Sequence, residues 1–266
     1  MRIAVLLSGQ VRDWMVCRDN QKFFWTSCTQ KDPQVDYFIH TWDYSQDRTG
    51  VTKPYQNRNI SEQEFEEILD FYQPKKYIIE SKPSKDVFYD DHWCNLFYSF
   101  VKSLQFKREY ELENNFKYDV VVKSRFDLAF DPRYHFRIPV LFNNCLYTTH
   151  GGPMEMECGM FNFNDCVFLG NSYSMDLLIN IYHYRQFLIR TFEQKDSLTD
   201  NRNRPGHPYG PGTLMHEYFR DYGITPMFNM GWQETIIKAG HPEGLNLFKP
   251  EEFDIMEKYF RDWYLN

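Results

Sequence analysis

The first half of the chain alternates short apolar runs with longer segments whose apolar residues recur every three or four positions. Short runs rich in β-branched residues predict strands, and the longer periodic segments predict amphipathic helices. Strands are expected over residues 2–7, 35–39 and 76–80 and from residue 118, and helices over 13–28, 61–72 and 91–114. This β-α-β-α-β-α-β order predicts parallel strands joined by right-handed crossovers.

Two of the helices carry additional signals. Residues 61–64 read Ser-Glu-Gln-Glu, a capping box in which the Ser and Glu side chains satisfy free amides at a helix start. Pro74 ends that helix. In the segment 91–114 the apolar positions fall on one helical face, which we expect to pack against the sheet. These positions are Trp93, Leu96, Phe97, Phe100, Val101 and Leu104.

The second half is less regular. Strands are expected over 145–148 and 166–169, and helices over 175–192, with Ser174 as cap, and over 213–222. The chain shows neither an internal repeat nor a low-complexity linker, so residues 1–266 are interpreted as one domain. The predicted class is α/β, with a mostly parallel central sheet flanked by helices and a less regular C-terminal half.

Composition narrows the classes of protein. With 18% aromatic and 25% charged residues, the 266-residue chain is predicted to be globular. Its net charge of −7 argues against a nucleic acid held by bulk charge, but it allows a local pocket for a small phosphate ligand. No apolar run has the roughly 20 residues that span a bilayer. Neither a membrane span nor a cleaved signal peptide is predicted, and six cysteines without CxxC spacing give no support for structural zinc.

The strongest candidate site follows the apolar run Val120–Val122. This run predicts a buried strand, and Lys123, Arg125 and Asp127 come directly at its end. In open α/β sheets ligands bind beyond the carboxyl ends of the strands, so the segment is a candidate for binding phosphate or a cation. The alternative is an internal Arg–Asp ion pair with no ligand.

A second candidate is the loop Ser8-Gly9-Gln10-Val11-Arg12, which follows the first strand. Glycine lets a ligand approach the backbone, and an arginine fork can bind phosphate. The loop lacks the Walker lysine and the GxGxxG spacing, so neither a P-loop nor a Rossmann dinucleotide site is supported. A plain tight turn is the alternative.

The later part of the chain offers three weaker candidates. Asp165 precedes a predicted strand and could contact sugar hydroxyls or deprotonate an acceptor; a turn or cap aspartate is the alternative. Glu217 lies on the helix after a Gly/Pro loop that could act as a lid or be an exposed loop. His241 lies alone in a turn, where a surface role is the alternative to a metal ligand.

Taken together, the pattern resembles the GT-A class of nucleotide-sugar glycosyltransferases, and within it the small bacterial and viral enzymes of the WavE-like surface-polysaccharide group. The likeness covers most of residues 1–225. It is carried by the segments Leu6–Arg12, Phe38–Trp42, Tyr98–Lys102, Tyr118–Leu128 and Asn164–Gly170.

The resemblance implies a donor site in residues 1–131 and a sugar or acceptor site in residues 132–266. GT-A enzymes use an Asp-x-Asp motif to hold Mn²⁺ or Mg²⁺ on the donor diphosphate; here Arg125 stands at the first Asp position and Asp127 at the last. His241 would be a further metal ligand, and Asp165 would lie near the transferred sugar. The remaining donor-binding residues would be Ser8, Gly9, Arg12, Thr41, Asp43, Lys102 and Lys123.

The sequence therefore predicts a cytoplasmic transferase, in a bacterial or virus-infected cell, that moves a sugar from a donor such as a UDP- or GDP-sugar to a carbohydrate or lipid-linked acceptor. If the reaction inverts the anomeric centre, Asp165 is the first candidate for the base and Glu217 the second. A non-catalytic carbohydrate- or nucleotide-binding protein is the main alternative, because the first Asp of the motif is missing. A sulfotransferase is a weaker one, since its phosphate loop with a lysine is absent.

Overall fold

The computed structural model describes residues 1–27, 33–47, 56–81, 92–130, 138, 140–148, 166–184, 211–227 and 234–236. The fold and the site are derived from these parts of the chain. Asp165 and His241 lie outside them, as do the expected helical positions 185–192.

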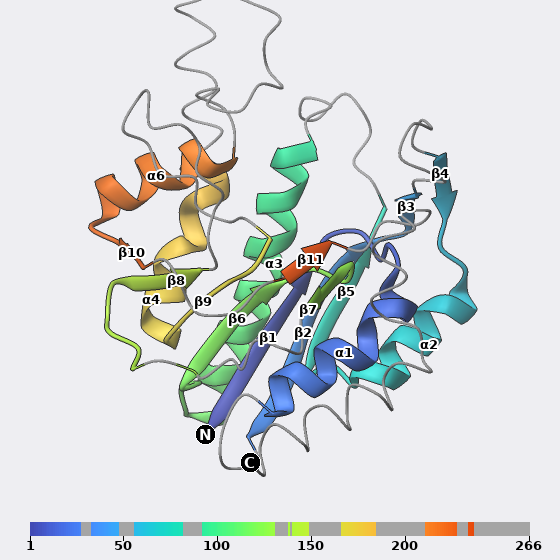
Figure 1. Ribbon diagram of the computed structural model, residues 1–266, viewed down its shortest axis with the longest axis horizontal. Coiled ribbons are helices and arrows are strands. Elements are labelled where there is room, and N and C mark those ends of the chain that lie inside the picture. Colours follow the sequence, from blue (N-terminus) through green and yellow to red (C-terminus); the bar gives the residue numbers. More distant parts are fainter. Residues whose placement is uncertain are drawn as a thin grey trace, which may run out of the picture.

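A seven-stranded sheet in the order β10-β8-β9-β6-β1-β2-β5 forms the centre of the molecule (Figure 1). Its strands are β1 (Arg2–Ser8), β2 (Gln34–Trp42), β5 (Lys76–Glu80), β6 (Val120–Ser124), β8 (Cys145–Thr148), β9 (Phe168–Gly170) and β10 (Thr225–Met227). Every neighbouring pair is parallel except the two made by β9, which runs antiparallel to β6 and to β8. The predicted α/β class with a mostly parallel sheet is thus confirmed.

Helices cover both faces of the sheet (Figure 1). They are α1 (Trp14–Ser27), α2 (Glu62–Tyr72), α3 (His92–Asn114), α4 (Ser172–Asp176) continued by the 3₁₀ turn η2 (Leu177–Asn180), and α6 (Pro211–Tyr222). β1 shows why this strand is apolar throughout: Ile3, Val5 and Leu7 pack in the core under α1 and α2, whereas Ala4 and Leu6 pack in the core under α3, α4 and α6. A strand buried on both faces must be continuously apolar.

The helix caps confirm one expectation and correct two. Ser61 caps α2, its hydroxyl accepting a hydrogen bond from the Glu64 amide at 3.1 Å. The Glu64 side chain does not complete the capping box, because it instead accepts from Arg58 and from the Trp14 indole. Ser174 is not the cap of the later helix: Asn171 is, with its side-chain oxygen accepting from the Ser174 amide at 2.8 Å.

Several strands that local patterns did not predict come from pairing between distant segments. β3 (Tyr44–Asp47) and β4 (Gln56–Asn59) form an antiparallel pair where a polar loop was expected. β7 (Leu128–Phe130) pairs antiparallel with β11 (Glu234–Ile236), far along the chain. The strand expected over 166–169 is shifted and covers Phe168–Gly170.

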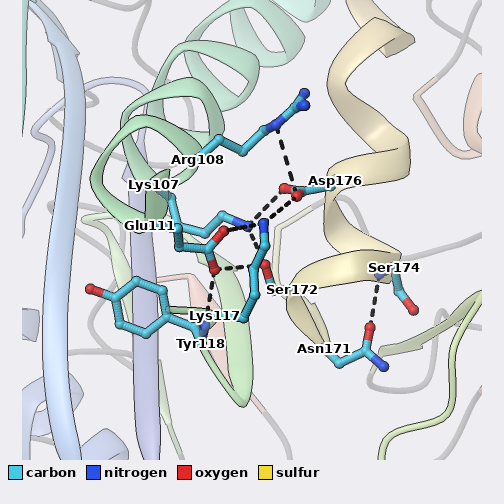
Figure 2. A network of polar contacts seen from close by, with 9 residues as sticks. All are labelled: Lys107, Arg108, Glu111, Lys117, Tyr118, Asn171, Ser172, Ser174 and Asp176. Atoms are coloured by element: carbon cyan, nitrogen blue, oxygen red, sulfur yellow. Dashed lines mark hydrogen bonds and ion pairs between the residues drawn. The ribbon is translucent and has the colours of Figure 1, made fainter. Parts of the chain in front are cut away.

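A network of charges centred on the buried Lys107 joins α3 to α4 beside the amino-terminal ends of the parallel strands (Figure 2). The Lys107 ammonium donates to Ser172 Oγ at 2.6 Å and to Asp176 Oδ1 at 2.7 Å, and it lies 3.1 Å from Glu111 Oε2. Glu111 also accepts from Ser172 Oγ and from the Tyr118 amide. Lys107 is buried and has three N–H donors, so these three acceptors satisfy it completely.

No helix in the described parts of the chain has the length and hydrophobicity needed to cross a membrane.

Candidate functional site

The carboxyl ends of β1, β2, β5 and β6 lie next to one another, because these four strands are parallel neighbours. The segments that follow them therefore meet at one edge of the sheet, the upper edge in Figure 1. Open α/β sheets bind ligands at this edge. We call it the carboxyl edge.

Arg12, Asp127 and Arg125 form a cluster at the carboxyl edge. Arg125 grips the Asp127 carboxylate with two parallel hydrogen bonds, Nε to Oδ1 at 2.7 Å and Nη2 to Oδ2 at 2.6 Å. Arg12 approaches from the loop after β1, with its Nε 3.4 Å from Asp127 Oδ2. The internal ion pair considered from the sequence is therefore present, and it includes a second arginine.

The cluster is layered from inside to outside. The Asp127 side chain is 3% exposed, whereas the side chains of Arg125 and Arg12 are 16% and 25% exposed. Burial alone would raise the pKa of Asp127, but the adjacent guanidinium groups of Arg125 and Arg12 outweigh it and hold this pKa below its usual value. Asp127 is thus a buried carboxylate that stays ionised, fixes Arg125 with two hydrogen bonds and forms a looser ion pair with Arg12.

Two amides on α1 hold the turn that carries this cluster. Gln21 Nε2 donates to the carbonyls of Arg125, Phe126 and Leu128 at 2.8, 3.1 and 2.7 Å. Asn20 exchanges two hydrogen bonds with the backbone of Phe130. The sequence analysis missed both residues, although one signal was present: they are polar, yet they share the buried face of α1 with Cys17 and Phe24.

Gly9 forms the turn after β1 at φ +109°, a conformation that favours glycine. Its amide lies 2.7 Å from Ser99 Oγ and 3.2 Å from the His40 carbonyl, and its carbonyl accepts from Thr41 Oγ1 at 2.8 Å. An added Cβ at Gly9 would meet no described atom within 4 Å. The turn is thus held by Ser99, His40 and Thr41, and it is open at the position of the Gly9 Cβ.

His40 lies beneath this turn and is neutral at physiological pH. Its Nδ1 is 2.8 Å from Ser99 Oγ, and its Nε2 is 3.6 Å from Glu80 Oε2, too long for a hydrogen bond. Burial lowers the pKa of His40 to about 4 even though Glu80 acts in the opposite direction. Glu80 in turn accepts from the Tyr98 hydroxyl at 2.8 Å and lies 4.0 Å from the Lys102 ammonium.

The structure brings some of the predicted site residues together and turns others inward. Arg12, Arg125 and Asp127 are in mutual contact. Thr41 and Lys123 are buried and donate to the carbonyls of Gly9 and Cys166. They support the carboxyl edge rather than face a ligand.

Three further candidates occupy separate positions. Ser8 is buried at the end of β1. Asp43, at the end of β2, accepts a hydrogen bond from Ser81 Oγ at 2.6 Å. Glu217 pairs with Arg220, one turn further along α6, and the side chain of Glu217 is 29% exposed.

Asp127 does not fit the role of metal ligand that the resemblance gave it. Both of its oxygens accept hydrogen bonds from Arg125, and a divalent cation there would stand against two guanidinium groups. Within the described parts of the chain, no three His, Cys, Asp or Glu side chains are grouped so that they could hold a metal ion.

Comparisons with known proteins give little beyond this geometry. No family model matches the sequence, and no curated protein matches it significantly. Among solved structures, the chain is similar to a crystal structure of a glycosyltransferase involved in the glycosylation of the major capsid of PBCV-1, at 11% sequence identity and a TM-score of 0.39, with 86% of this chain and 81% of that chain covered. A likeness this distant carries no weight in assigning an activity to this chain.

Proposed function

We propose that the protein is a glycosyltransferase that moves a sugar from a nucleoside-diphosphate sugar to a carbohydrate or lipid-linked acceptor. The observation that carries the proposal is the cluster of Arg12 and Arg125 around Asp127, next to the open turn at Gly9. Guanidinium groups bind phosphate oxygens in a two-pronged geometry, and a glycine turn lets a ligand approach the backbone.

The position of the cluster supports a nucleotide ligand. It lies at the carboxyl edge, where the parallel strands β1 and β6 end side by side. On this proposal the diphosphate contacts the arginines, and the nucleoside extends over the end of β2 towards Asp43 and Lys102. Residues 1–131 then form the donor-binding half and residues 132–266 the acceptor-binding half of one domain.

The chemistry of the transfer needs a base if it inverts the anomeric centre. The acceptor oxygen forms a bond to the anomeric carbon, the bond from that carbon to the diphosphate oxygen breaks, and a carboxylate takes the acceptor proton. Asp165 is our first choice for that carboxylate and Glu217 the second.

A thermal-shift panel followed by product analysis tests this function. UDP, GDP, CDP, dTDP and their sugars are screened first, because a ligand that binds only the native protein raises its melting temperature. The stabilising sugar nucleotide is then incubated with candidate acceptors, and release of the free nucleotide is measured. We expect one nucleotide class to stabilise the protein and its sugar to be turned over.

A second candidate function is non-catalytic binding of a nucleotide or carbohydrate. The engagement of Asp127 by two arginines favours it, because the motif position that usually binds metal is already filled by side chains. Stabilisation by a sugar nucleotide without release of nucleotide, across a panel of acceptors, would select this candidate.

A further inference from the structure

We propose that the guanidinium groups of Arg12 and Arg125, rather than a divalent cation on Asp127, neutralise the diphosphate of the donor. This inference rests on the proposed function, because it assigns how that donor is held. It predicts a nucleotide site that works without metal.

The first step is the layering of the cluster. A ligand that arrives from solvent meets the side chains of Arg12 and Arg125, which are 25% and 16% exposed, before it meets Asp127, which is 3% exposed. A metal ion on this carboxylate would share the Asp127 oxygens with the two hydrogen bonds from Arg125. A phosphate group can instead contact the N–H groups of the more exposed Arg12 and leave those hydrogen bonds intact.

The second step is electrostatic. A divalent cation on Asp127 would lie beside the guanidinium groups of Arg12 and Arg125 and would be repelled by both. Partial burial strengthens this repulsion, because the local dielectric is lower than that of water. A phosphate group in contact with Arg12 meets an attractive charge instead.

The third step is the donor capacity of Arg12. A guanidinium carries five N–H donors, and in the described parts of the chain Arg12 has a single charged partner, Asp127, at 3.4 Å. The remaining donors are available to a ligand. Asp127 and the turn held by Gln21 fix the direction of Arg125, so this arginine is preorganised before the ligand binds.

The test is calorimetric titration of UDP, GDP, CDP and dTDP into the full chain, in excess EDTA and again in excess Mn²⁺. We expect the nucleotide that binds to do so with the same dissociation constant under both conditions. Arg12→Gln should weaken this binding about 10- to 100-fold, the usual effect of losing a hydrogen bond to a charged group. Arg12→Lys should recover part of the affinity, because it keeps the charge but loses the fork.

Arg18→Gln is the matched control. Arg18 lies on α1, is 29% exposed, pairs with Asp19 and packs over Trp14 and Phe71. The Arg18 variant should bind nucleotide as the wild type does, with melting temperatures measured for all variants to verify folding.

The outcomes separate this inference from the proposed function. Binding that requires Mn²⁺ would overturn the inference and leave the proposed function standing, as would unchanged binding by Arg12→Gln. The absence of binding to any of the four nucleotides under both conditions would overturn both.

Discussion

Two clusters of buried charge lie at opposite ends of the parallel strands, one at the amino-terminal ends and one at the carboxyl edge. They differ in how many of their hydrogen-bond donors have acceptors. Between α3 and α4, the three N–H donors of Lys107 meet three acceptors, on Glu111, Ser172 and Asp176 (Figure 2). At the carboxyl edge, both oxygens of Asp127 accept hydrogen bonds from Arg125, while Arg12 uses little of its donor capacity. The network between α3 and α4 also has exposed cations at its rim, Arg108 and Lys117, so unused donors alone do not mark a site. The cluster of Arg12, Arg125 and Asp127 is the candidate site because it lies where the parallel strands end.

The largest loss of stability is expected for Lys107→Met, in the network between α3 and α4. It leaves Glu111 buried without its central cation and removes a partner of Asp176, so we expect a loss of about 4 kcal/mol in the free energy of unfolding. Urea denaturation measures it, and nucleotide affinity should not change. Lys117→Met is the control: Lys117 also pairs with Glu111, but it is 59% exposed, so its loss should cost less than about 1 kcal/mol. Equal losses in the two variants would show that burial does not distinguish them.

Asp127→Asn tests the cluster at the carboxyl edge in the same way. It removes the anion between Arg12 and Arg125, and we expect a loss of about 3 kcal/mol in the free energy of unfolding, together with weaker nucleotide binding. The variant thus tests fold and site together, unlike Arg12→Gln, which should reduce affinity with little effect on stability. Wild-type stability in Asp127→Asn would contradict the central position of this carboxylate.

Acidification should act on the carboxyl edge through His40. Its pKa is about 4 in the folded protein, against about 6.5 when unfolded, so the unfolded chain binds the proton more tightly. The stability that neutral His40 contributes to the folded protein is complete above pH 6.5 and is lost as the pH falls towards 4. Through this group we expect the protein to be about 2 kcal/mol less stable at pH 5 than at pH 8.

Urea denaturation as a function of pH checks this, and His40→Asn is the comparison variant. In that variant the slope of stability between pH 4 and 6.5 should be reduced. Identical pH profiles for the two proteins would show that His40 does not carry the dependence.

Gln21→Met is expected to destabilise the protein less than Lys107→Met or Asp127→Asn, but it should act on the site. The carbonyls of Arg125, Phe126 and Leu128 lose their shared donor, which should cost roughly 1 to 2 kcal/mol. Because the turn then holds Arg125 less firmly, nucleotide affinity should fall as well. Gln63→Met, on the exposed side of α2, is the control. Unchanged affinity in Gln21→Met would remove the positioning role of this amide.

The sequence predicts those parts of the fold that local chemistry decides. The β-branched run Val120–Val122 favours a strand covered on both faces, and Ser61 bonds an amide three residues away, so both were found. The reversed direction of β9 and the pairing of β7 with β11 depend on contacts between distant segments, which no local pattern contains.

The same distinction holds for the site. Arg125 and Asp127 are two residues apart, and the sequence analysis already considered their pairing. Gln21 reaches carbonyls more than a hundred positions along the chain, and Ser99 bonds an amide ninety positions earlier. Such partners could be suspected only as polar residues on an otherwise apolar helix face.

Hydrogen–deuterium exchange, with and without the nucleotide selected by the thermal-shift panel, tests the central claim most directly. We predict slower exchange in peptides that cover residues 8–12 and 124–128, and unchanged exchange in peptides that cover 107–118 and 171–176. Slower exchange only in the peptides that cover 107–118 and 171–176, or slower exchange in no peptide, would contradict a nucleotide site at the carboxyl edge.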